Sequence, residues 1–176
     1  MRYARMSLVR NSRLARRSLV PAVLISLSLP VAPAKAERMF QPLRFFEGRT
    51  ELLSLVKVTM KKPYSSKTLG RGQILSDGSL SLIQQVHDQG KPTRHRRWLI
   101  REISPGRFTG TMSDAVGPVQ IQQIGGKFLF RFSMKGKLAI EQWITPLPGG
   151  KSARSKVTVK KLGMRVATSE GTIRKL

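Results

Sequence analysis

The sequence predicts an all-β protein, a single antiparallel up-and-down barrel of about ten short strands that follow a short helical turn. Two-residue alternation of apolar and polar side chains recurs from residue 49 to the end of the chain, and turn signals separate these runs. No later stretch of ten or more residues shows helical periodicity. Because hairpin follows hairpin without a long connection, we favour a barrel over a sandwich, and closure leaves no sheet edge exposed.

Residues 1–36 have the three parts of a secretory signal peptide. A start rich in arginine precedes the apolar residues 19–30, and the small residues Ala34 and Ala36 follow. A signal peptidase accepts small side chains at that spacing. We therefore expect cleavage after Ala36.

The competing interpretation of this segment is an uncleaved membrane anchor. Its apolar run is shorter than the ~20 residues that span a bilayer, and Pro21 and Pro30 interrupt it. Cleavage is therefore favoured, with the periplasm as the expected location and extracellular release as the second choice. The pair Arg16 and Arg17 leaves a twin-arginine route open beside the general export route.

The barrel domain is predicted to span residues 37–176 and to begin with a helical turn. Phe40, Leu43 and Phe46 recur every three residues, a spacing typical of one helical face. We expect this turn to pack at one end of the barrel.

Glycine and proline mark the turns between the predicted strands. The second strand is polar and carries Gly70 and Gly72, and glycines inside a strand predict a bend or bulge. The expected strands cover residues 49–61, 64–74, 80–86, 93–102, 107–112, 119–122, 127–134 and 138–144, a ninth segment around Val157 and Val159, and 164–173.

The stretch 107–119 forms the central hairpin of this plan. Its first part alternates strictly, breaks at Ser113 and Asp114, and turns again through Gly117. Aspartate in turns accepts backbone N–H bonds, so Gly110, Asp114 and Gly117 are predicted to shape a structural corner. The alternative places Asp114 at the barrel mouth, in contact with a ligand.

The charge balance of the chain is strongly basic. The formal net charge is +24, from 33 basic and nine acidic residues. Seven basic residues precede position 37, which leaves 26 against nine and a net charge of +17. Such a charge attracts nucleic acid, anionic lipid or acidic polysaccharide, and no motif indicates a specific nucleic-acid partner. The absence of cysteine excludes disulfides, thiolate metal sites, a Cys nucleophile and a lipid-modified N-terminal Cys.

Several short runs together resemble one known family. They are Phe45-Phe-Glu-Gly48, Leu69-Gly-Arg-Gly72, Ser76-Asp-Gly78, Arg96-Arg-Trp-Leu-Ile100, Arg107-Phe-Thr-Gly110, Ser113-Asp-Ala-Val-Gly117 and Lys161-Leu-Gly-Met-Arg-Val166. The pattern resembles the DUF3833 family of uncharacterised bacterial envelope proteins, many of them lipoproteins. The resemblance implies a lipocalin-like barrel and brings no activity or ligand with it. This chain departs from the family in lacking a lipobox cysteine and in having Gln142 where the family tends to have an acidic residue before the tryptophan.

The apolar face of two strands supplies a candidate barrel lining. Its members are Phe108, Met112, Phe128, Phe130, Phe132 and Met134. By default these side chains are expected to pack in a filled core. The alternative is that they line a pocket for a small apolar or amphiphilic ligand.

A dense basic group beside Trp98 supplies a candidate anionic-surface site. Its members are Lys91, Arg94, Arg96, Arg97 and Arg101. A solvated outer face is the alternative, because strand ends often carry such residues.

The sequence offers little for catalysis or metal binding. His87 and His95 are the two histidines, neither lies in a His-x-His or His-Glu-x-x-His motif, and no serine lies in a Gly-x-Ser-x-Gly elbow. We expect no metal, no cofactor and no enzymatic activity. Two functions follow as hypotheses: a non-catalytic periplasmic protein that holds a lipid-like ligand in its barrel, or an envelope protein whose basic outer face binds anionic lipid, lipopolysaccharide or cell-wall polymer.

Overall fold

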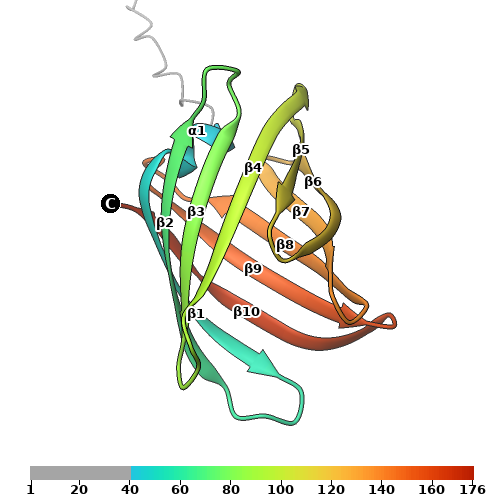
Figure 1. Ribbon diagram of the computed structural model, residues 1–176. Helices are drawn as coiled ribbons and strands as arrows, with labels where there is room; N and C mark the ends of the chain where they lie inside the picture. The colour runs from blue at the N-terminus through green and yellow to red at the C-terminus, as the bar shows by residue number, and fades with distance from the viewer. Residues whose placement is uncertain (1–40) are drawn as a thin grey trace, which may run out of the picture. The chain divides into compact units, whose positions relative to one another are not determined.

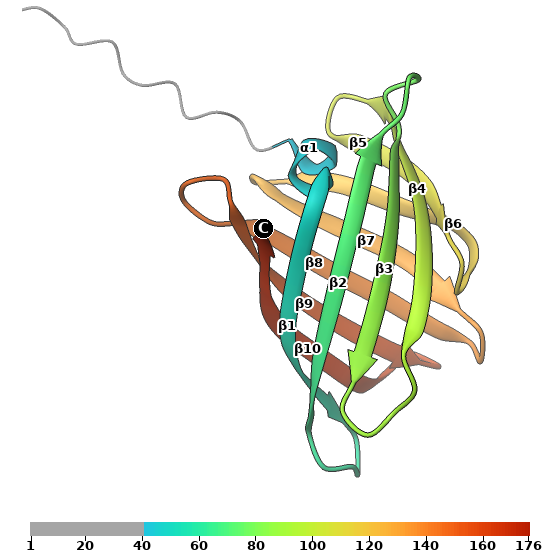
Figure 2. The same ribbon diagram turned by 60° about the vertical axis from the view of Figure 1, so that its left-hand side comes forward.

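The computed structural model describes residues 41–176 as one helix and ten antiparallel strands in a closed barrel (Figures 1 and 2). The elements are α1 (Pro42–Phe46), β1 (Gly48–Val58), β2 (Tyr64–Ile74), β3 (Leu80–Asp88), β4 (Arg94–Ser104), β5 (Arg107–Met112), β6 (Ala115–Ile124), β7 (Lys127–Met134), β8 (Leu138–Pro146), β9 (Ser152–Lys161) and β10 (Met164–Lys175). Each strand pairs with its neighbour in sequence, and β1 pairs with β10 to close the barrel. The predicted fold class is confirmed.

The hairpin turns alternate between the two ends of the barrel. Helix α1 and the β2–β3, β4–β5, β6–β7 and β8–β9 turns lie at one end, here called the closed end (Figure 2). The remaining five turns lie at the other end, here called the open end. Among the described residues, the helix is too short to cross a bilayer.

Helix α1 covers the closed end with two aromatic side chains. Pro42 occupies its first turn, where the missing N–H is not needed. Phe45 and Phe46 are buried, with ring centroids 5.1 Å apart in an edge-to-face contact. The predicted helical turn is confirmed. Leu43 is only partly buried, and Phe40 lies outside the described residues.

The glycines of β2 have a different role from the predicted one. The pairing of β2 with both neighbours is continuous through Gly70 and Gly72, so the expected bend or bulge there is wrong. A Cβ at position 72 would overlap the carbonyl oxygen of Phe46. The missing side chain therefore lets the backbone of α1 lie directly on β2.

The central corner is also shorter than predicted. Only Ser113 and Asp114 separate β5 from β6, which begins at Ala115 rather than at Val119. Gly117 has a φ of 81° inside a register shift of β6 against β7. The expected turn through Gly117 is therefore a β-bulge within a strand, a position where positive φ favours glycine.

Candidate functional site

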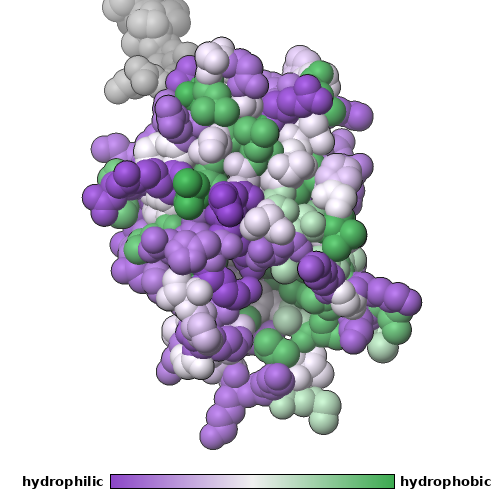
Figure 3. Space-filling view, in the orientation of Figure 1, coloured by the Kyte–Doolittle hydropathy of each residue, from purple (hydrophilic) through white to green (hydrophobic). Residues whose placement is uncertain are grey.

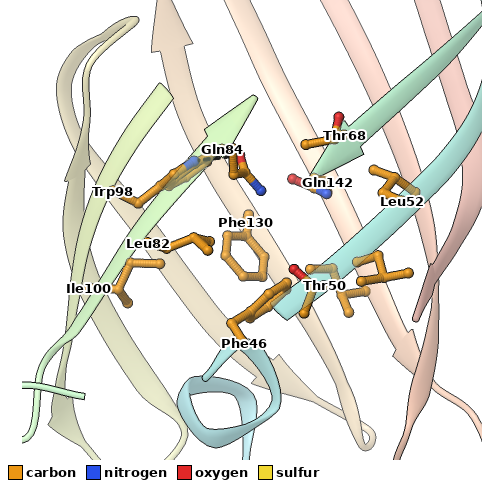
Figure 4. Close-up of a pocket in the computed structure, with 12 residues that line it drawn as sticks. Phe46, Thr50, Leu52, Thr68, Leu82, Gln84, Trp98, Ile100, Phe130 and Gln142 are labelled. Atoms are coloured by element: carbon orange, nitrogen blue, oxygen red, sulfur yellow. Dashed lines mark hydrogen bonds between the residues drawn. The ribbon is translucent and has the colours of Figure 1, made fainter. Parts of the chain in front are cut away.

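The closed half of the barrel is packed with side chains. Its core includes Phe46, Leu80, Phe108, Val119 and Phe128. Here Phe108 and Phe128 meet with ring centroids 6.4 Å apart. This half holds a pocket of about 40 Å³, lined mainly by apolar residues (Figure 4). That volume suits a few water molecules, whereas small-molecule pockets usually need roughly 300 Å³ or more.

A layer of polar side chains lies on the side of this pocket away from α1. Thr68, Gln84 and Gln142 lie on this side of the pocket in Figure 4, on β2, β3 and β8. The indole Nε1–H of Trp98 donates to Gln84 Oε1 at 2.8 Å, and Gln142 Nε2 donates to Ser155 Oγ at 3.0 Å. Within the described residues, no buried side-chain nitrogen or oxygen lacks a hydrogen-bond partner. This layer separates the packed core from the open half of the interior.

The open half of the barrel is not filled. Many apolar side chains that face inward by strand alternation stay only partly buried there, although Val86 and Ile140 on the same face are buried. The partly buried ones are Val56, Val58, Tyr64, Phe132, Met134, Leu138, Val157, Val159 and Ala167. Figure 3 shows a hollow with hydrophobic side chains in its depth and hydrophilic ones at its border. Water thus reaches apolar surface on the inside of the barrel.

Two ion pairs border the mouth of this open half. Arg94 Nη2 lies 2.7 Å from Asp88 Oδ2, and Arg96 Nε lies 2.9 Å from Asp114 Oδ2. Arg94 and Arg96 share the inward face of β4 with Trp98, because they alternate with it. The mouth of an apolar hollow therefore carries two guanidinium groups.

The wall beside these arginines is incomplete. Strand β5 pairs with β4 only from Trp98 onward, since the chain turns at Ser113. The Arg97 carbonyl oxygen accepts the Ser113 N–H at 3.0 Å, and the preceding residues of β4 have no β5 partner. Asp114 reaches from the corner to Arg96 across this gap. The sheet is therefore unpaired on this side of β4, beside the mouth of the barrel.

Asp88 stays ionised in spite of its burial. Desolvation raises the pKa of its carboxyl group, but the Ser66 hydrogen bond and the charge of Arg94 together outweigh that effect. Its pKa therefore lies below the ordinary value of 3.8. The carboxylate holds Arg94 at the mouth near neutral pH.

The six predicted lining residues divide between the two halves. Phe108, Met112, Phe128 and Phe130 are buried in the packed core. Phe132 and Met134 lie further toward the mouth and stay partly buried. Phe132 meets Trp98 edge to face, with ring centroids 5.7 Å apart.

The five predicted basic residues do not form one face. Arg94 and Arg96 face the interior, whereas Arg97 and Arg101 alternate with them and face outward. Lys91 lies in the β3–β4 turn, with Nζ 3.9 Å from the ring centroid of Tyr64. Strand alternation applied to β4 would have revealed this division.

The corner residues have structural contacts. A Cβ at Gly110 would overlap the carbonyl oxygen of Leu99, so glycine permits close approach of β4. Asp114 was expected to accept backbone N–H bonds. Instead it accepts from the Arg96 guanidinium and, at 3.1 Å, from the Ser113 hydroxyl.

The histidines lie away from any metal-binding arrangement. His87 Nδ1 is 3.0 Å from the Thr93 hydroxyl, and His95 is exposed. Across residues 41–176, no three His, Asp or Glu side chains gather closely enough to hold a metal ion. His87 also borders a broad depression of about 600 Å³, which includes the exposed Leu53 and Leu55 of β1.

Several interior residues of the site were not singled out from the sequence. Gln84 and Gln142 each sit between apolar residues on the inward face of their strands, and Asp88 ends β3 on that face. Strand alternation places these polar residues on the inward face, and that position could have identified them from the sequence. For Val157 and Val159 the sequence pattern indicates only a strand.

The barrel and its half-open interior define a lipocalin-like fold. Comparison with solved structures agrees. The S-type phycobiliprotein lyase CPES from Guillardia theta is similar with a TM-score of 0.61 and 9% sequence identity, over 76% of this chain and 90% of the lyase.

A second solved structure has the same fold. It is a protein with unknown function from the DUF3598 family of Nostoc punctiforme, with a TM-score of 0.56 and 14% identity. The match covers 80% of this chain and 51% of that protein, so this chain spans about half its length. No protein-family model matches the chain, and no curated protein matches its sequence. At these identities the likeness shows the fold alone.

Proposed function

We propose that the open half of the barrel binds a small amphiphile, with its apolar part inside and an anionic head group at the mouth. One observation carries the proposal: inward-facing apolar side chains such as Val157, Val159 and Phe132 remain accessible to water. Exposed apolar surface inside a concave site is the usual basis of small-molecule binding. A ligand there would remove that surface from water, at about 25 cal/mol per Å².

The head group in this proposal meets Arg94 and Arg96. Both guanidinium groups lie at the mouth, and both already pair with carboxylates. Arginine binds carboxylate or phosphate groups with two parallel hydrogen bonds. The ligand is therefore proposed as an amphiphile with one of these groups.

The proposal includes no catalytic step. The similar structure from Guillardia theta is a phycobiliprotein lyase, but at 9% identity the similarity concerns the fold and not the reaction. Location in the periplasm after removal of residues 1–36, and kinship with the DUF3833 family, complete the proposal. Export is tested by the N-terminal sequence of the chain recovered from a periplasmic fraction, expected to begin at Glu37.

Ligand binding is tested with a dansylated fatty acid as the probe. Val157→Trp places a large side chain in the open interior, and Thr158→Trp places the same side chain on the outer face of the same strand. We expect Val157→Trp to weaken probe binding by about tenfold or more, equivalent to about 1.4 kcal/mol, and Thr158→Trp to leave it unchanged. Equal affinity in both variants, with both folded by circular dichroism, would reject the interior site.

The head-group part of the proposal needs a second comparison. A fatty acid and the fatty alcohol of equal chain length differ only in the anionic group. We expect the acid to bind more tightly, with a difference that shrinks as salt is added. Equal binding of acid and alcohol would reject the role of the arginines while leaving the apolar site in place.

A further inference from the structure

Two turns at the open end present large apolar side chains to solvent. Met60 in the β1–β2 turn is 99% exposed. Leu162 in the β9–β10 turn is 72% exposed, and Met164 beside it is 68% exposed. These side chains contribute nothing to the packed core. Their place at turn tips therefore needs another explanation.

Met60 and Leu162 also have positive φ angles, a backbone conformation in which apolar residues are uncommon. Met60 has a φ of 62° and Leu162 a φ of 50°. Leu162 and Gly163, both with positive φ, form a two-residue hairpin loop that usually takes Asn, Asp or Gly. An apolar side chain there has an unfavourable backbone conformation and gains no burial. Departures from local preference of this kind are expected at functional positions.

Basic residues accompany the apolar tips. Lys61 and Lys62 follow Met60, while Lys161 and Arg165 flank the β9–β10 turn, and all four are exposed. The β7–β8 turn at the same end adds two more lysines, Lys135 and Lys137.

The acidic residues near this end do not cancel that charge. Asp88 is paired with Arg94, and Asp114 is paired with Arg96. At the closed end the exposed Ile103 follows Glu102, and Glu47 pairs with Arg44. Exposed basic residues such as Arg107, Lys127 and Lys151 are also present there, so the apolar turn tips beside the lysines are what set the open end apart. Positive charge and protruding apolar side chains coincide at the open end.

We propose that the turns of the open end dock on the surface of an anionic lipid bilayer. Met60, Leu162 and Met164 enter the interfacial region, and the lysines meet lipid phosphates. Interfacial binding of this type combines buried apolar area with attraction to anionic lipid. Docking would bring the mouth of the barrel to the membrane surface. The proposal is independent of whether a ligand occupies the interior.

The first test uses flotation with vesicles of phosphatidylglycerol and phosphatidylcholine. The variant Met60→Asn/Leu162→Asn removes both apolar tips, and Asn tolerates positive φ, so folding is preserved. Ile103→Thr/Ile124→Thr removes exposed apolar side chains at the closed end as a matched control. We expect the first variant to bind about tenfold more weakly or worse, and the control to bind as the wild type does. Equal losses in both variants, or no loss in the first, would overturn the proposal.

The second test reports which end meets the membrane. Because the chain has no cysteine, a single cysteine can carry an environment-sensitive fluorophore. The label at Met60→Cys is expected to shift to the blue on addition of the anionic vesicles, and the label at Ile103→Cys is not. The shift should weaken with added salt and be small with pure phosphatidylcholine vesicles. A shift at position 103 as large as at position 60 would reject docking through the open end.

Ligand binding and docking can fail separately. Val157→Trp changes the interior and leaves the turns intact, so it should bind vesicles as the wild type does. The turn variant should bind the dansylated fatty acid normally in the absence of vesicles. Loss of both activities in either variant would contradict their separation.

Discussion

At the scale of single residues, Asp88 shows how the mouth of the barrel is organised. Its side chain is only 4% exposed, yet its pKa is lowered, because the Ser66 hydrogen bond and Arg94 outweigh desolvation. A group with a depressed pKa stabilises the folded state above its unfolded pKa. That contribution is lost as pH falls through the folded value.

We therefore expect Asp88→Asn to lower the free energy of unfolding by about 1–3 kcal/mol near neutral pH. The difference from the wild type should shrink as the pH falls from the ordinary value of 3.8 through the lower folded pKa of Asp88, below which both proteins carry a neutral side chain. Urea unfolding at a series of pH values measures this. A difference that stays constant down to about pH 2.5 would show that the charge is not the cause.

Leu162 illustrates an unfavourable local conformation. Its φ of 50° is uncommon for a residue with a branched side chain. Leu162→Asn should raise the melting temperature by about 2–4 °C, as expected for a gain of about 1 kcal/mol in a chain of this size. Met164→Asn, where no positive φ is found, serves as the control and should give no gain. A lower melting temperature for Leu162→Asn would mean that the leucine stabilises the fold.

At the scale of elements, α1 covers the closed end of the barrel. It is five residues long, too short to be stable alone, and is held by the burial of Phe45 and Phe46. The glycine at position 72 gives its backbone room on β2. A helix of this kind depends on its contacts with the barrel.

Loss of the aromatic contact between α1 and the barrel should therefore destabilise the folded protein. We expect Phe46→Ala to lower the free energy of unfolding by about 3–5 kcal/mol, because it empties a buried aromatic site. Leu43→Ala, on the partly buried side of α1, should have a clearly smaller effect. Denaturant unfolding measures both, and equal effects would contradict the packing described for α1.

At the scale of the whole molecule, the barrel has two unlike halves. The closed half is a packed core, and the open half exposes inward-facing apolar side chains. Segments with fewer buried contacts open more readily. The two halves should thus differ in local stability although the same strands run through both.

Hydrogen exchange followed by mass spectrometry tests this difference within one strand. In β9 we expect the amides around Ala153 and Ser155, which are buried, to exchange more slowly than those around Val159 and Lys160. The same order should hold in β1, with Thr50 protected more strongly than Val58. Uniform protection along both strands would contradict the lower local stability expected for the open half. A bound amphiphile should slow exchange mainly in the open half.

The strands of this barrel could be predicted because alternation is a local signal. Phe128, Phe130, Phe132 and Met134 follow one another at a spacing of two, and Gly125 with Gly126 marks the turn before them. Since every strand pairs with its neighbour in sequence, local hairpins were enough to predict the barrel. Helix α1 was found for the same reason.

The candidate site was predicted less completely, because depth along a strand is not a local property. Alternation places Phe128 and Phe132 on the same inward face, but the first is in the core and the second is in the open half. The same holds for Arg94 and Arg96, whose partners are supplied by other strands or turns. The glycine at position 72 was predicted to bend a strand, because nothing nearby in sequence shows that α1 lies upon it.

By itself, the sequence determined the all-β class, the order of the hairpins and the excess of positive charge, since these depend on neighbouring residues and composition. Only the tertiary structure decided which end α1 closes, which half of the interior stays open, and which turns carry the exposed Met60 and Leu162 beside the lysines. These features arise when residues distant in sequence meet as β1 pairs with β10. Closure of the barrel thus converts a series of similar hairpins into a molecule with one packed end and one open end.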